Sequence, residues 1–261
     1  MYKLLTKSFL KLLPLSLSTL TLPINAAPIP FGQRDYIQHR ANQPNFGAAT
    51  TQEGCVNHLQ SNGGQEAFVK TMWLTFDTLD RNQWLESGCT KSLTATSITI
   101  PNPNIDDVSF FEGHYFAYNT YVNVPGQTQP QSRYHEGRVN IGTVIPSGNH
   151  RYKIERDITQ NNRWCNAVNN VASYCITLPG VDNYNAAGYI TVGIESRDTS
   201  HTFTNNTRAE NIWYRPVSNS GFIRLPNMLK RDNMATSRTW SSSYTSATST
   251  IPDRIIFKNQ P

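Results

Sequence analysis

The chain has 261 residues, with 23 Lys and Arg against 18 Asp and Glu, which gives a formal net charge of +5. No basic run is longer than Lys230-Arg231, which argues against a nucleic-acid partner and against a polybasic membrane tether. The first 26 residues hold three lysines and no acid, so the remainder carries a charge of only +2.

The first 26 residues have the pattern of a signal peptide. Lys3, Lys7 and Lys11 form a basic start, and residues 12–22 are largely apolar but interrupted by a proline and several Ser and Thr. This run is too short to span a bilayer. We therefore expect cleavage near Ala26 and a secreted mature protein, extracellular or periplasmic, with no membrane attachment.

The rest of the chain divides by composition into an N-terminal extension at 27–64, a strand-rich core at 65–217 and a Ser/Thr-rich C-terminal segment at 218–261. We expect the C-terminal segment to pack on the core, with residues 254–258 as a last strand. Gly, Pro and Asn pairs typical of turns separate the strand candidates. Many short strands and almost no amphipathic helix predict an all-β fold, a two-sheet sandwich of the concanavalin-like jelly-roll type. The predicted core strands are 67–76, 83–86, 97–100, 115–124, 137–144, 150–158, 164–168, 174–178, 189–195 and 211–216.

Four cysteines in an exported chain are expected to form disulfides. Cys165 and Cys175 flank a stretch with the turn signal Asn169-Asn170, so they can face each other across a short hairpin. That pairing leaves Cys55 with Cys89. The sequence has no Cys-x-x-Cys motif and its six His are scattered, so we expect no metal site and no other cofactor.

Two glutamates each lie inside a predicted strand. Glu86 is in the sequence Trp-Leu-Glu-Ser-Gly, and Glu195 is in Gly-Ile-Glu-Ser. In the second strand the apolar residues Ile190 and Val192 mark the core side, so alternation puts Glu195 on the opposite side. We expect Gly193, on the same side, to leave room above the sheet.

Aromatic and amide side chains accompany these glutamates. Trp84 shares a side of its strand with Glu86, and Tyr189 shares one with Glu195. The strand at 115–124 has two alternating rows, and the sequence does not decide which row faces the core. A sheet face lined by Tyr, Trp, Asn and carboxylates suits an extended polymer, either an extracellular polysaccharide or a peptide. The candidate ligand-binding residues are Trp84, Tyr189, Tyr115, Asn119 and Tyr121.

Two functions fit this pattern. The first is a secreted binding protein for an extended polymer, a glycan or a surface partner, in which Glu86 and Glu195 only solvate a sheet face. The alternative is a hydrolase in which the two carboxyls take different protonation states: the ionised acid activates water, and the neutral acid protonates or polarises the scissile bond. A glycoside hydrolase would use such a pair in the same way. The sequence does not indicate an oligomeric state.

The motifs also carry a resemblance, which spans about residues 65–217. Their order and spacing resemble a group of uncharacterised secreted bacterial jelly-roll proteins of concanavalin-like type. More distantly, the chain resembles the glutamic peptidases of the eqolisin and neprosin types. That resemblance implies a catalytic pair on a concave sheet, with Glu195 in the place of the eqolisin glutamate and Glu86 in that of the eqolisin glutamine. The neprosin type has two carboxylates. The motifs are Gln83 to Gly88, His150 to Arg156, Trp164, Gly193 to Ser196 and Asn211 to Tyr214.

Overall fold

A computed structural model describes most of the chain from residue 34 onwards. The predicted signal peptide, the strand predicted at 97–100 and Cys55 lie outside it. No helix within this part is both long and apolar enough to cross a membrane. The described residues are 34–53, 58–60, 68–78, 81–92, 105–106, 112–122, 125–126, 128, 131–139, 148–160, 162–178, 187–217, 219–234 and 238–259.

The described segments are mostly strands. The strand predicted at 137–144 begins and ends earlier than expected, at Gln131–Val139. The strands are β1 (Asp35–Asn45), β2 (Gly47–Gln52), β3 (Leu59–Gln60), β4 (Phe68–Thr78), β5 (Arg81–Ser92), β6 (Ile105–Asp106), β7 (Gly113–Val122), β8 (Gln131–Val139), β9 (His150–Arg156), β10 (Arg163–Val168), β11 (Val171–Thr177), β12 (Ala187–Ser196), β13 (Thr202–Phe203), β14 (Thr207–Tyr214), β15 (Ile223–Arg224), β16 (Leu229–Lys230), β17 (Ser241–Thr245) and β18 (Arg254–Lys258).

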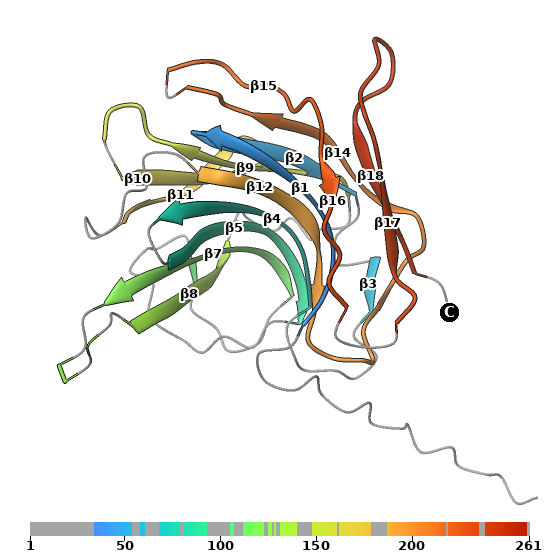
Figure 1. Ribbon diagram of the computed structural model, residues 1–261, viewed down its shortest axis with the longest axis horizontal. Coiled ribbons are helices and arrows are strands. Elements are labelled where there is room, and N and C mark those ends of the chain that lie inside the picture. The colour runs from blue at the N-terminus through green and yellow to red at the C-terminus, as the bar shows by residue number, and fades with distance from the viewer. Residues whose placement is uncertain are drawn as a thin grey trace, which may run out of the picture.

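The strands of the described residues form two large antiparallel sheets (Figure 1). The first has the order β16-β1-β12-β4-β5-β7-β8-β6, and the second has the order β11-β10-β9-β2-β14-β18-β17, with β15 beside β14. Side chains from both sheets, among them Phe116, Trp164 and Phe257, pack in one apolar core. The predicted all-β two-sheet sandwich is therefore confirmed. Figure 1 also shows that the long strands of the first sheet are strongly curved, and the face of this sheet opposite the core is called the concave face below.

Strands of both sheets also lie outside the predicted core at 65–217. Residues 35–52, placed in the N-terminal extension by composition, supply β1 to the first sheet and β2 to the second. Near the other end of the chain, β17 and β18 continue the second sheet, and β18 has the predicted bounds 254–258. The short strand β16 pairs with β1. Distant parts of the chain thus complete both sheets.

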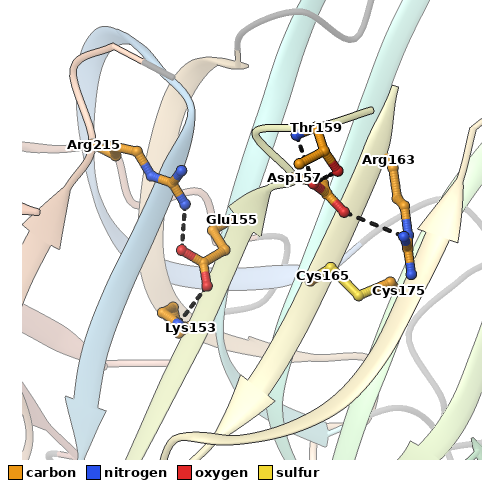
Figure 2. The surroundings of a disulfide bond; sticks show 8 residues. All are labelled: Lys153, Glu155, Asp157, Thr159, Arg163, Cys165, Cys175 and Arg215. Atoms are coloured by element: carbon orange, nitrogen blue, oxygen red, sulfur yellow. Dashed lines mark hydrogen bonds and ion pairs between the residues drawn. A yellow bond between two sulfur atoms is a disulfide. The ribbon is translucent and has the colours of Figure 1, made fainter. Parts of the chain in front are cut away.

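The hairpin of β10 and β11 carries a disulfide between Cys165 and Cys175, as predicted (Figure 2). The two cysteines are direct cross-strand partners. Asn169 and Asn170 form the turn, with left-handed backbone at both positions. Cys89 is also disulfide-bonded.

Charged side chains line the outer side of the second sheet beside this hairpin (Figure 2). Glu155 forms ion pairs with Lys153 and Arg215. Asp157 pairs with Arg163 at 3.3 Å and accepts hydrogen bonds from Thr159. The alternate residues of β9 are buried, so this strand is amphipathic, as a sandwich strand with one solvated side must be.

Candidate active site on the concave face

Both glutamates singled out in the sequence lie on the concave face. Trp73 of β4 pairs with Glu86 of β5 on one side and with Thr191 of β12 on the other. Glu195 follows Thr191 by four residues and therefore lies on the same face of β12. Their exposed fractions are 5% for Glu86 and 4% for Glu195. Both carboxylates are thus almost withdrawn from bulk water.

Two glycines lie in the cross-strand row between the glutamates. Gly193 and Gly88 both pair with Thr71 of β4. A Cβ atom added to Gly193 would lie 2.5 Å from the carbonyl oxygen of Ile37, and one added to Gly88 would lie 2.3 Å from that of Lys70. The neighbouring strands thus fill the room predicted above Gly193. A close approach of a neighbouring backbone is one of the reasons for glycine inside a strand.

Gly88→Ala is expected to lower the free energy of unfolding by about 2 kcal/mol or more, because the added methyl group would force backbone atoms of β4 to move. Gly148→Ala is the matched control, since a Cβ atom there would have no neighbour within 4 Å. Its effect should stay within about 0.5 kcal/mol. Chemical denaturation measures both changes, and equal stability of the two variants would contradict the close approach of β4 and β5.

Arg34 is the charged partner of Glu195. Its Nη1 atom lies 2.5 Å from Oε1 of Glu195 and donates a hydrogen bond of 3.3 Å to the hydroxyl of Tyr36. Burial acts to lower the pKa of Arg34, but Glu195, Tyr36 and Glu86 raise it overall. The pKa of Tyr36 is raised, first by burial, then by the charge of Glu195 and least by that of Glu86. Arg34 acts in the opposite direction and lowers this pKa. Glu195 therefore contacts this guanidinium, whereas Glu86 acts on Arg34 and Tyr36 only through its charge and is the smallest of the causes.

Glu86 has a second phenol as its direct partner. The hydroxyl of Tyr115 donates a hydrogen bond to Oε1 of Glu86, and the Tyr115 ring is fully buried beside Val69 and Trp73. A guanidinium thus contacts Glu195 and a phenol contacts Glu86. Different surroundings of this kind separate the acid from the base in sites with two carboxyl groups.

The structure shows which of the two alternating rows of β7 faces the core. Tyr115 and Asn119 lie on the concave side, whereas Phe116 and Tyr118 belong to the core between the sheets. Asn119 is buried, and its Oδ1 atom accepts a hydrogen bond of 2.7 Å from the backbone N–H of Trp84. Both polar residues of this row therefore have partners within the protein, and a ligand contact for them stays a prediction.

Trp84 and Tyr189 are half-buried on the concave face, on either side of Thr75, with which both pair. The guanidinium carbon of Arg40 lies 5.1 Å from the centroid of the Tyr189 ring. Tyr121 belongs to β7, but its side chain lies outside the described part of the structure. Ligand contacts of these three aromatic residues likewise stay predictions.

Three residues of this face were not predicted from the sequence: Arg34, directly before β1, and Tyr36 and Arg40 within it. One signal for them was present, because Ile37 and Ala41 alternate with polar residues as in a strand with one buried side. Within the described ranges, no group of three or more His, Cys, Asp and Glu side chains is placed to hold a metal ion.

Comparisons with known proteins add little to the fold described above. The chain matches no protein-family model and no curated protein by sequence. It is similar in structure to a β-porphyranase from the human gut bacterium Bacteroides plebeius, with a TM-score of 0.31 and 13% sequence identity. The match covers 60% of this chain and 54% of that chain, so about half the length of the porphyranase is represented. A likeness of this size carries no argument about activity.

Proposed function

We propose that the chain is a secreted hydrolase that cleaves extended polypeptides on the concave face, with Glu86 and Glu195 as its acid and base. One observation carries the proposal: two carboxylates, each more than nine-tenths buried, lie on one sheet face with different partners, Arg34 at Glu195 and Tyr115 at Glu86. Carboxyl groups that are withdrawn from water and have different partners can serve as the acid and the base of one site. Two glutamates that merely solvated a sheet face would be exposed to water.

The partners of the two glutamates suggest their roles. Glu195 is the base, because Arg34 compensates its negative charge, and it takes a proton from the water molecule that attacks the scissile carbonyl carbon. Glu86 is the acid, oriented by Tyr115, and it gives its proton to the amide nitrogen as the C–N bond breaks. The water oxygen ends in the new carboxyl group, and one proton passes through each glutamate.

Several aromatic rings of the concave face are covered by other side chains, and this favours a polypeptide substrate over a glycan. Trp73 and Tyr115 are buried, with exposed fractions of 8% and 0%, and Arg40 covers one side of the Tyr189 ring. Sugar rings are commonly held by stacking on open aromatic faces. The resemblance to the glutamic peptidases points to peptides for the same two positions, Glu86 and Glu195.

The second candidate is a polysaccharide-binding face without catalysis. It is favoured by the half-buried rings of Trp84 and Tyr189, which lie two strands apart across Thr75.

The purified mature protein, incubated with a denatured protein mixture and with plain polysaccharides from acid to neutral pH, distinguishes these functions. We expect new amino termini in the protein mixture and no new reducing ends in the polysaccharides. Reducing ends alone would identify a glycosidase and contradict the proposal. Polysaccharide binding without either product would support the second candidate, a binding face without catalysis.

A further inference from the structure

Arg40 lies on the concave face, and no acid among the described residues forms an ion pair with it. It is half-buried on β1, with its guanidinium stacked on the ring of Tyr189 at 5.1 Å. The buried Nε atom has no hydrogen-bond partner, and within the described residues Arg40 forms no ion pair with an acid. Stacking on a ring leaves the edge of a guanidinium, where its N–H donors lie, available to an acceptor.

A second unsatisfied group lies directly opposite Arg40. Thr191 of β12 is its cross-strand partner and has an exposed fraction of 2%. In the part of the chain that the structure describes, the Oγ1 atom of Thr191 has no hydrogen-bond partner. Buried polar groups are almost always hydrogen-bonded. Two adjacent side chains with unused donors therefore indicate that an acceptor arrives with a ligand.

The position of this pair relates it to the glutamates. Leu229, Arg40, Thr191, Trp73 and Glu86 form one continuous row across five strands. Three strand spacings separate the backbones at Arg40 and Glu86, or about 14 Å. An extended peptide covers that distance in about four residues.

We propose that Arg40 and Thr191 bind the carboxylate of an Asp or Glu side chain three to five residues from the scissile bond. This inference rests on the proposed peptide hydrolysis but uses different residues from the acid and base. A carboxylate accepts two parallel hydrogen bonds from the guanidinium edge. The Thr191 hydroxyl is covered in this structure, so it donates a third hydrogen bond when the side chains above it move aside for the carboxylate. Leu229, with an exposed fraction of 54%, offers an apolar contact to the neighbouring substrate residue.

Mapping of cleavage sites by mass spectrometry in a denatured protein mixture tests the subsite. The wild type should show Asp and Glu enriched at one position three to five residues from the cut. Arg40→Gln should lose this enrichment, and Arg40→Glu should replace it with Lys and Arg. For matched peptides with Glu or Gln at that position, kcat/KM should differ about tenfold in the wild type and little in Arg40→Gln.

A matched control removes the same charge elsewhere. Arg151 lies on β9 between buried neighbours, so its side chain is on the outer side of the second sheet. Arg151→Gln should keep the tenfold preference. Thr191→Val, which removes the hydroxyl but keeps the shape, should weaken the preference while leaving its position in the substrate unchanged. A preference for Glu that survives in Arg40→Gln would overturn the subsite.

Binding separates failure of the subsite from failure of the hydrolase. The Glu195→Gln variant is titrated by calorimetry with oligoglutamate and oligoglutamine peptides. If the variant binds oligoglutamate more tightly than oligoglutamine and the wild type cleaves neither peptide, the subsite is kept and hydrolysis is refuted. Cleavage with equal rates for Glu and Gln peptides would refute the subsite and keep hydrolysis. Equal binding of both peptides without cleavage, or stronger binding of an oligouronate than of either, would overturn the inference.

Discussion

Glu195→Gln is expected to slow cleavage of denatured protein by about a thousandfold, within the range that a general base contributes. Glutamine keeps the shape of the side chain, but its amide cannot take a proton from water. The readout is the initial rate of new amino termini, measured beside the thermal unfolding of each variant. Full activity in a folded Glu195→Gln protein would contradict the proposed base.

Glu86→Gln should have a smaller effect, about ten- to a hundredfold, because an amide can still donate a hydrogen bond to the departing nitrogen although it cannot give up a proton. The glutamic peptidases of the eqolisin type, which the sequence resembles distantly, have a glutamine where this chain has Glu86. Glu210→Gln is the matched control, since Glu210 is a half-buried acid of β14 in the second sheet. It should retain full activity. A greater loss in Glu86→Gln than in Glu195→Gln would exchange the roles of the two acids.

The fold could be predicted from the sequence where the strands are apolar. In β12, Ile190, Val192 and Ile194 fill the core side and leave no doubt about the period. β1 gave a weaker signal, because its core side contains the buried polar residues Asp35 and His39 beside Ile37. β17 gave a weak signal for the same reason, since its sequence consists only of Ser, Thr and Tyr. These strands depend on neighbours far along the chain, which local periodicity cannot reveal.

Only part of the candidate site could be predicted, because local periodicity does not show which strands are neighbours. Alternation within one strand is enough to put Glu86 and Trp84, or Glu195 and Tyr189, on a common face. The strand order that brings Arg34 to Glu195 across 161 residues is set by the packing of the whole sandwich. The stacking of Arg40 on Tyr189 likewise needs β1 beside β12.

Lys70→Met is expected to lower the free energy of unfolding by about 3 kcal/mol, the largest effect on stability that we predict. Lys70 is fully buried on the core side of β4. Its Nζ atom donates hydrogen bonds to the carbonyl oxygens of Glu53 (2.9 Å) and Arg208 (2.7 Å) and to Oγ1 of Thr207 (2.8 Å). Methionine fills the space but leaves these acceptors without the ammonium group. Lys91→Met, at a partly exposed lysine paired with Glu112, is the control and should change stability by less than about 0.5 kcal/mol.

The pH dependence of this effect follows from the titration of Lys70. Burial lowers its pKa from 10.5 to about 7 in the folded protein. Between these values the unfolded chain holds a proton on Lys70 that the folded chain lacks, so the group makes the free energy of unfolding rise with pH. Methionine binds no proton, and the stability difference between wild type and Lys70→Met should therefore grow from about pH 7 to about pH 9.5 and stay constant below about pH 7. Urea denaturation of both proteins measures this difference. A constant difference across the whole range would mean that the three acceptors keep the ammonium group charged within the core.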